Sequence, residues 1–283
     1  MRSRVAVVGV GAFGEAHVQA YRAQGAELVG VADSDIDRAG MIADRYQIPY
    51  FTDDPYALIN ELKPDGVSVA TPAASHIALA AHAVSCGVRV LLEKPIATGS
   101  RELRQLPPSA DELATPAHVL RFEPVHRHLH DLVAAGDLGT ILAISASRNR
   151  ARWHLDRYRD IHPALLTAVH DIDLAVWLTG SRANVVSALS TPHPPSEQPA
   201  TVFAQVDAVD GSIWSIRSCW LLPDSSPPTD QIEVYGTRGV ATIRVESDRT
   251  TLSSPSPTDL IESRPLSLTP GLAEEIEHLG LST

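Results

Sequence analysis

The chain has 283 residues, 44% of them hydrophobic and 20% charged, which suits one large or two ordinary globular domains with well-developed cores. The 34 aspartates and glutamates outnumber the 23 lysines and arginines, and the net charge of −11 argues against binding to nucleic acid or an anionic membrane. Two cysteines predict neither a disulfide framework nor a cysteine metal site, and we expect no metal. Because no run of about 18 apolar residues occurs, we expect a cytoplasmic protein without a membrane segment.

The first predicted strand and turn lie at the start of the chain. Apolar residues 5–8 lead into Gly9-Val-Gly11-Ala12-Phe13-Gly14, and residues 15–21 have the pattern of a helix. In a dinucleotide-binding fold the first glycine permits a tight turn, the second lets the backbone approach a pyrophosphate, and the third lets the helix pack closely. This order predicts a phosphate site at the helix N-terminus, where backbone N–H groups and the helix dipole favour negative charge.

A second apolar strand, residues 27–32, ends on Asp33, about 20 residues past the glycines. There a carboxylate can accept hydrogen bonds from the adenosine ribose and would repel a 2′-phosphate, which predicts NAD as the cofactor. Ser34 and Arg38 leave NADP open. The alternative is that Asp33 only caps the helix that follows and that the glycines form an ordinary turn.

Strands and helices then alternate, with strands at residues 48–51, 66–70 and 88–92 and helices at 35–46, 55–62 and 75–85. This alternation predicts a parallel, doubly wound sheet, in which ligands bind at the carboxyl ends of the strands. Further cofactor contacts are therefore expected where the later strands end, at Thr71, Pro72, His76, Glu93, Lys94 and Pro95.

The pattern changes near residue 120. After an expected strand at 117–121, helices at 124–135 and 163–178 flank a strand at 140–148, and strands follow at 185–190, 202–209, 213–222, 231–235 and 240–245. Asp210-Gly211 predicts a hairpin turn, and residues 192–199 and 253–257 are expected loops. We therefore predict a Rossmann domain, residues 1–120, followed by a mixed α+β domain, residues 121–283, with a large, mainly antiparallel open sheet.

Five segments together resemble the Gfo/Idh/MocA oxidoreductases, the glucose-fructose oxidoreductase and inositol dehydrogenase type. They are residues 9–14, Thr71-Pro-Ala-Ala-Ser-His76, Glu93-Lys-Pro95, residues 118–124 and His170-Asp-Ile-Asp173. The resemblance implies an NAD(P)-dependent dehydrogenase or reductase acting on a hydroxyl or ketone of a sugar, nucleotide sugar or cyclitol. It also implies a homodimer or homotetramer formed through the second domain's sheet.

The resemblance implies roles for particular residues. Lys94, before a proline that relatives often hold in the cis form, would exchange the substrate's hydroxyl proton, and His170 would share that transfer. Asp173, three residues further along the same helix, either orients His170 or bonds elsewhere. Arg121 is a candidate substrate contact by resemblance alone. Arg148, Arg150, Arg152 and Arg159 either line the substrate pocket or belong to a solvated loop.

The chain departs from the family pattern in two places. The aspartate that relatives place four residues before the histidine is here Leu166, for which His162 is the candidate substitute, unless His162 only caps the helix. The chain also ends soon after an expected helix that starts near residue 271, where relatives usually continue. These departures leave open a catalytically silent dinucleotide-binding relative that acts as a sensor or scaffold, and an enzyme that retains NAD and uses transient oxidation for another reaction.

Overall fold

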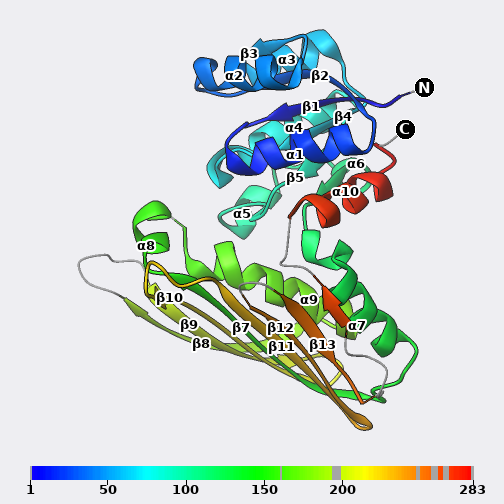
Figure 1. Ribbon diagram of the computed structural model, residues 1–283, viewed down its shortest axis with the longest axis vertical. Coiled ribbons are helices and arrows are strands. Elements are labelled where there is room, and N and C mark those ends of the chain that lie inside the picture. Colours follow the sequence, from blue (N-terminus) through cyan, green and yellow to red (C-terminus); the bar gives the residue numbers. More distant parts are fainter. Residues whose placement is uncertain are drawn as a thin grey trace. The chain divides into compact units, whose positions relative to one another are not determined.

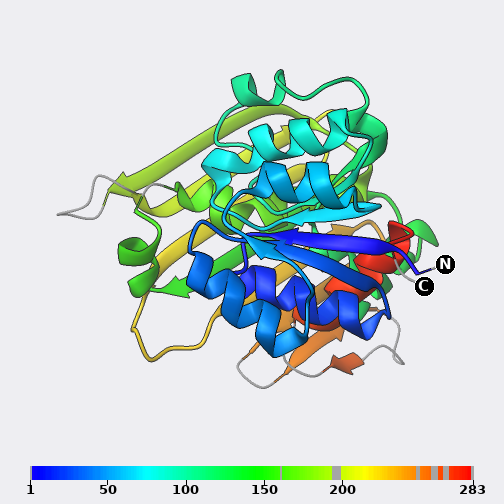
Figure 2. The same cartoon turned by 90° about the horizontal axis from the view of Figure 1, so that it is seen from above.

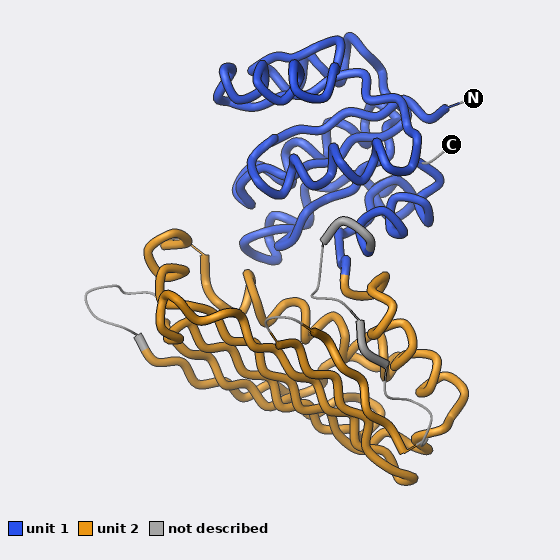
Figure 3. The backbone as a smooth tube through the Cα atoms, in the orientation of Figure 1, with its two compact units in different colours: residues 1–119, 268–283 blue, residues 120–267 orange. Residues whose placement is uncertain are grey.

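The computed structural model describes residues 2–159, 161–192, 199–246, 249–255, 261–263 and 268–281. The chain forms two compact units, residues 1–119 with 268–283 and residues 120–267 (Figure 3). The last helix, α10 (Leu268–His278), belongs to the first unit, although the sequence placed it in the second domain. Residues 193–198 and 256–257 of the two expected loops lie outside the described residues. No helix in the described part of the chain has the length and hydropathy needed to cross a membrane.

The first unit contains a parallel sheet with strand order β3-β2-β1-β4-β5-β6. Its strands are β1 (Arg4–Val8), β2 (Glu27–Ala32), β3 (Phe51–Thr52), β4 (Gly66–Val69), β5 (Arg89–Leu92) and β6 (Ala114–Pro116). Its helices, besides α10, are α1 (Ala12–Ala23), α2 (Ile36–Tyr46), α3 (Pro55–Leu62), α4 (His76–Ser85), α5 (Ser100–Leu103) and α6 (Ala110–Leu113), with a 3₁₀ turn η1 (Ala73–Ser75). Figure 2 shows α1 and α2 on one face of this sheet and α3 and α4 on the other.

The strands of this sheet are apolar because both of their faces are covered. Residues 5–8 of β1 and all four residues of β4 are buried. Side-chain caps set two helix starts: Asp35 accepts from the N–H of Arg38 at α2, and Asp54 accepts from Tyr56 and Ala57 at α3. The doubly wound parallel sheet predicted from the alternation is confirmed.

The prediction of a strand at residues 117–121 is wrong. The last strand, β6, covers residues 114–116, and η2 (Val119–Phe122) is a 3₁₀ helix. Ala117 still donates to Leu92 O of the neighbouring strand, but the N–H of His118 turns back to Pro116 O at 2.9 Å. That tight turn ends the strand before Val119 and Leu120, the apolar residues of the expected strand.

The second unit contains an eight-stranded sheet with strand order β14-β13-β12-β11-β7-β10-β9-β8, and confirms the predicted mainly antiparallel open sheet. The strands are β7 (Ile141–Ala151), β8 (Ala183–Pro192), β9 (Pro199–Ala208), β10 (Ile213–Leu222), β11 (Thr229–Gly236), β12 (Gly239–Val245), β13 (Thr250–Ser253) and β14 (Ile261–Ser263). The pair β7–β10 is parallel, the other described pairs are antiparallel, and the predicted hairpin turn joins β9 to β10. The helical segments are α7 (Pro124–Ala134), α8 (Trp153–Arg157), a π-helix η3 (Ala164–Ala168) and α9 (Val169–Thr179).

One face of this sheet is covered and the other is open. Figure 1 shows α7 and α9 on the same face, and no described element of this unit covers the opposite one. Large apolar side chains of strands β8 to β10 are exposed on this open face. The strand pairings place Val185, Leu189, Phe203 and Ile213 on the same side of the sheet. We call these four residues the open apolar face.

Candidate functional site

The glycine turn between β1 and α1 has the backbone that a dinucleotide requires. Gly9 has φ +83°, and an added Cβ there would lie 2.8 Å from the Ala70 backbone. A Cβ on Gly14 would lie 1.8 Å from Gly9 O, so α1 can approach β1 only with glycine at this position. A Cβ on Gly11 would meet nothing within 4 Å. Two glycines therefore serve packing, and the third leaves open backbone at the start of α1, where the pyrophosphate of NAD would fit.

Asp33 lies next to this turn at the end of β2. Its carboxylate accepts from the Val10 N–H at 2.8 Å and from the Asp35 N–H at 3.0 Å. Arg38 donates to both Asp33 oxygens at 3.1 and 3.2 Å and also pairs with Asp35 at 2.9 Å. The Arg38 guanidinium is thus already held by two carboxylates. Ser34 follows Asp33 as an exposed residue in the turn before α2.

The turns after β4 and β5 are joined by one histidine. His76 is 1% exposed, and its Nε2 lies 2.7 Å from Thr71 O while its Nδ1 lies 2.8 Å from Pro95 O. The Ser75 hydroxyl donates to Thr71 Oγ1 at 2.8 Å, and Pro72 is exposed in the same turn. The turns that carry Thr71 and Lys94 are therefore held together at the carboxyl edge of the sheet.

Lys94 follows β5 at this edge and is half-buried, with a cis peptide bond to Pro95. Its ammonium lies 5.6 Å from the centroid of the Phe13 ring, which belongs to the first turn of α1. Its N–H donates to Glu93 Oε2 at 3.1 Å, and Glu93 Oε1 lies 2.9 Å from Nε2 of His17. The glycine turn, Asp33, His76 and Lys94 thus lie along one edge of the same unit.

The pKa of Glu93 is lowered. Burial by itself raises it, but the hydrogen bond and charge of His17 and the ammonium and N–H of Lys94 together outweigh burial. His17 was not part of any motif recognised in the sequence. The signal that could reveal it is its position on the inward face of α1, four residues before the fully buried Tyr21.

In the second unit, Arg121 and Asp173 form a two-pronged ion pair. Arg121 Nε donates to Asp173 Oδ2 at 2.8 Å and Nη2 donates to Oδ1 at 2.6 Å. The guanidinium also lies 5.9 Å from the Trp177 ring, against which His130 stacks. This ion pair links η2 to α9, and the orientation of His170 by Asp173 stays a prediction.

His170 lies at the start of α9, directly after the π-helix of residues 164–168. Leu166 is in that π-helix, whose hydrogen bonds span five residues, so the regular α-helical spacing assumed between Leu166 and His170 does not hold. His162 precedes the segment and accepts from the Ala164 N–H through Nδ1 at 3.1 Å. Burial lowers its pKa. This bond agrees with the capping alternative for His162, and its role as a substitute for the family aspartate stays a prediction.

Leu166 packs against a small core of Leu155, Ala200 and Trp220. We expect Leu166→Asp to lower the free energy of unfolding by about 1–3 kcal/mol, because it removes these contacts and places a carboxylate beside apolar side chains. Urea unfolding measures the loss, with Leu166→Ala as the control that removes the contacts without adding charge. A Leu166→Asp protein of unchanged stability would show that this leucine has no packing role.

Two of the four arginines proposed for the pocket lie in a buried ion network. Arg148 is 5% exposed and donates to Asp171 at 2.8 and 3.2 Å and to Asp230 at 2.6 Å, and Arg150 also pairs with Asp230. Burial and the Arg148 charge lower the pKa of the adjacent His126 to about 3. Neither alternative from the sequence, pocket lining or solvated loop, describes Arg148. The network links β7, α9 and β11.

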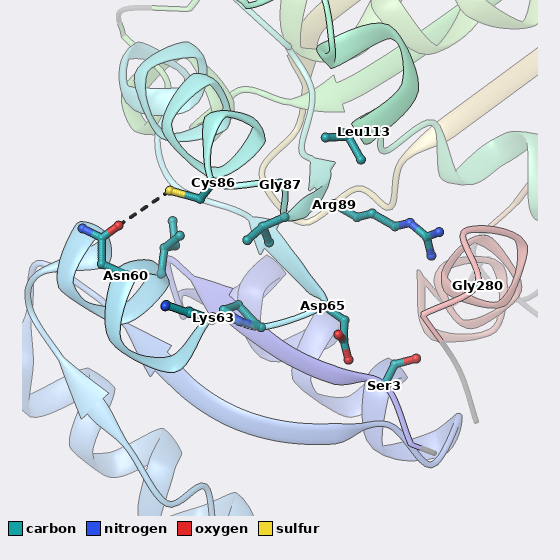
Figure 4. Close-up of a pocket in the computed structure, with 12 residues that line it drawn as sticks. Ser3, Asn60, Lys63, Asp65, Cys86, Gly87, Arg89, Leu113 and Gly280 are labelled. Atoms are coloured by element: carbon teal, nitrogen blue, oxygen red, sulfur yellow. Dashed lines mark hydrogen bonds between the residues drawn. The ribbon is translucent and has the colours of Figure 1, made fainter.

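A cavity of about 770 Å³ lies at the opposite, amino-terminal edge of the first unit's sheet, lined by residues that include Ser3, Lys63, Asp65, Cys86 and Arg89. Figure 4 shows the Lys63 ammonium and the Arg89 guanidinium pointing to different ends of it. These cations do not converge on one anion position, and neither the glycine turn nor Lys94 lines this cavity.

Two sequence profiles of one family match the chain. Residues 3–120 match the profile described as the oxidoreductase family, NAD-binding Rossmann fold, and residues 126–242 match the GFO/IDH/MocA C-terminal domain. Together they cover most of the chain.

Several curated relatives are similar to about two thirds of the chain. Inositol 2-dehydrogenase of Rubrobacter xylanophilus is 31% identical over 189 residues, which span 62% of this chain and 52% of that protein. UDP-N-acetylglucosamine 3-dehydrogenase of Acidithiobacillus ferrooxidans is 32% identical over 186 residues, 66% and 57% of the two chains. D-glucoside 3-dehydrogenase of Escherichia coli is 29% identical over 192 residues, which span 62% of this chain and 54% of that protein. The chain thus matches about half the length of these relatives.

Solved structures share the fold over nearly the whole chain. The Acidithiobacillus ferrooxidans UDP-N-acetylglucosamine 3-dehydrogenase superposes with a TM-score of 0.83 at 24% identity, covering 99% of this chain and 88% of that one. Scyllo-inositol dehydrogenase from Lactobacillus casei, with bound NAD(H) and scyllo-inositol, superposes with a TM-score of 0.85 at 17% identity, with coverage of 99% and 88%. The glycine turn, the matched profiles and this shared fold agree, and the chain belongs to the Gfo/Idh/MocA oxidoreductase family, with an NAD-binding Rossmann domain as its first unit.

Proposed function

We propose that this protein is an NAD-dependent oxidoreductase that moves a hydride between the nicotinamide and a hydroxyl or ketone carbon of a sugar, nucleotide sugar or cyclitol. The observation that carries the proposal is Lys94, a half-buried lysine on the same sheet edge as the open backbone of Gly11 and the carboxylate of Asp33. The curated relatives are dehydrogenases of an inositol, a nucleotide sugar and a glucoside, compounds that all carry ring hydroxyl groups.

When bound, NAD supplies the hydride chemistry, and the protein has to bind it, orient it and manage the hydroxyl proton. The free N–H groups at the start of α1 would hold the pyrophosphate, and Asp33 would accept from the ribose hydroxyls. Because the Asp33 carboxylate would repel a 2′-phosphate and Arg38 is engaged by two carboxylates, we propose NAD rather than NADP.

Lys94 is the group that we propose exchanges the substrate's hydroxyl proton, and His170 is the second candidate for that transfer. They lie in different units of the chain. With leucine at position 166 and His162 used as a helix cap, the set that we propose is Lys94 and His170 without a carboxylate from this helix.

The test is a screen of NAD reduction over inositols, aldoses, glucosides and nucleotide sugars, read as absorbance of the reduced nicotinamide. The proposal expects turnover with at least one ring polyol or sugar. The reverse reaction, oxidation of NADH by the corresponding ketones, covers a reductase. A folded protein that binds NAD yet turns over no substrate in either direction would contradict the proposed activity and favour a silent dinucleotide-binding relative.

We also propose that two copies of the chain associate through the open apolar face of the second unit. Its four large apolar side chains are exposed, among them Leu189 at 79% and Phe203 at 54%, and exposed apolar side chains on an uncovered sheet face are typical of an association site.

We expect the unaltered protein to elute as a dimer or tetramer in size-exclusion chromatography with light scattering, and the pair Leu189→Asp and Phe203→Asp to elute as smaller species. The control is Met41→Asp, an exposed apolar residue of α2 in the other unit, which should leave the mass unchanged. A monomeric unaltered protein at micromolar concentration would contradict the proposed association.

A further inference from the structure

A chain of buried polar side chains runs through the first unit and reaches the backbone of Lys94. Tyr21 OH lies 2.9 Å from Ser68 Oγ, and Ser68 Oγ lies 3.0 Å from Nδ1 of His17. Nε2 of His17 lies 2.9 Å from Glu93 Oε1, and Glu93 Oε2 accepts from the Lys94 N–H at 3.1 Å. Tyr21 and Ser68 are fully buried, and His17 is 1% exposed.

The chemistry of these groups sets the direction of the bonds. An ionised carboxylate can only accept, so His17 donates from Nε2 to Glu93. At Nδ1, a neutral His17 accepts from the Ser68 hydroxyl, whose oxygen then accepts from the Tyr21 hydroxyl, whereas a charged His17 donates to the Ser68 oxygen. In both forms Nε2 donates to Glu93, so the carboxylate is held by a buried hydrogen-bonded network.

The anchored groups come from elements far apart in the sequence. His17 and Tyr21 are on α1, Ser68 is on β4, and Glu93 directly follows β5. Charged neighbours act on this series of hydrogen-bonded side chains: the charge of Lys94 acts on Glu93, and the charge of Glu275 of α10 acts on Tyr21. Within the series, Glu93 is the group bonded directly to Lys94, the residue of the proposed proton transfer.

We propose that His17 is a positioning residue, which holds the Glu93 carboxylate beside Lys94 and thereby favours the charged form of the Lys94 amine. This inference rests on the proposed role of Lys94. Glu93 stabilises the ammonium form of Lys94 through its negative charge, and a carboxylate does so only while it is held close. His17 supplies the hydrogen bond that keeps it there.

The composition of the chain allows a direct test, because Lys63 and Lys94 are its only lysines. Reductive methylation with ¹³C-formaldehyde labels both amines and the N-terminus, and Lys63→Arg identifies the Lys94 signal. The titration of that signal in NMR reports the charge of Lys94 without any substrate. It is recorded for the unaltered protein and for Glu93→Gln, His17→Leu and His17→Gln, with His82→Leu as the matched control from α4.

We expect the Lys94 titration to move to lower pH by about one pH unit in Glu93→Gln, since removal of the negative charge destabilises the ammonium form. His17→Leu should move it in the same direction, because Glu93 loses its anchor. His17→Gln, whose amide can still donate to Glu93, should restore the midpoint of the unaltered protein, and His82→Leu should leave it there. With an identified substrate, His17→Leu should lower kcat by about tenfold or more while the KM for NAD stays within a few fold.

The inference would be overturned if the midpoint of the Lys94 titration did not move in Glu93→Gln or in a folded His17→Leu protein. So would a His17→Gln protein that shifts as far as His17→Leu, since the role would then not be the hydrogen bond. Should His17→Leu fail to fold, Glu93→Gln decides, because glutamine keeps the size of the glutamate side chain and removes its charge at a position that is 16% exposed. Turnover retained by Lys94→Ala would instead refute the proposed function and leave the titration result standing.

Discussion

Lys94→Ala is expected to lower kcat by about 10²–10⁴-fold, the usual contribution of a positioned proton-transfer group, while NAD affinity stays within a few fold. The amine lies beside the Phe13 ring at the cofactor edge, whereas the contacts that we assign to NAD are the α1 backbone and Asp33. Steady-state kinetics with the substrate found in the screen measures kcat, and calorimetry measures NAD binding.

Lys63→Ala is the matched control, because it removes the chain's other lysine, which is exposed at the end of α3 and lines the cavity at the opposite edge. Its kcat should equal that of the unaltered protein. A Lys94→Ala enzyme with normal kcat would remove this lysine from the mechanism and, with it, the observation on which the proposed function depends.

Arg148→Leu should produce the largest loss of stability, about 3–5 kcal/mol of unfolding free energy, because it leaves the buried Asp171 carboxylate without its partner. Urea unfolding at about pH 7 measures it. Arg217→Leu, the same change at an exposed arginine of β10, is the control and should cost little. An equal loss in both variants would contradict a role for the ion network.

The stability deficit of Arg148→Leu should depend on pH in a defined direction. Burial raises the pKa of Asp171 even though Arg148 opposes it, and without Arg148 that pKa rises further. A carboxyl whose pKa is higher in the folded than in the unfolded state binds its proton more tightly when folded, so stability falls as pH rises through that range. The loss of unfolding free energy in Arg148→Leu should therefore be smaller at about pH 5 than at about pH 8. Adding Asp171→Asn to the Arg148→Leu variant should remove this dependence on pH.

Much of the first unit could be predicted from sequence, because local patterns determine it. Strands β1 and β4 are buried on both faces, the glycines mark the turn, and Asp33 follows β2 at the position that a dinucleotide fold requires. The second unit was harder to predict. At the boundary between the units, residues 117–121 suggested a strand, but the turn after Pro116 redirects the chain. In the second unit, the π-helical segment before His170 has no sequence pattern that distinguishes it from an α-helix.

The contacts that organise the candidate site were not predictable for another reason: they join distant residues. His17 and Glu93 are 76 positions apart, and Arg148 and Asp230 are 82 apart. Neither pair follows a helical or strand period. A charged residue in such a pair cannot be told from a solvated one until the fold places its partner beside it, which is why Arg148 was not assigned to a buried network.

The central claim is that NAD lies on the open backbone at the start of α1, and calorimetric titration tests it most directly. We predict one NAD site per chain, weaker binding of NADP, and a loss of about tenfold or more, about 1.4 kcal/mol, in Gly11→Val. A Cβ at Gly11 meets no protein atom within 4 Å, so this variant should fold and yet block the pyrophosphate. Gly99→Val, at a glycine that is equally open, should bind NAD as the unaltered protein does. Absence of binding heat with the folded, unaltered protein, or undiminished binding by Gly11→Val, would contradict the claim.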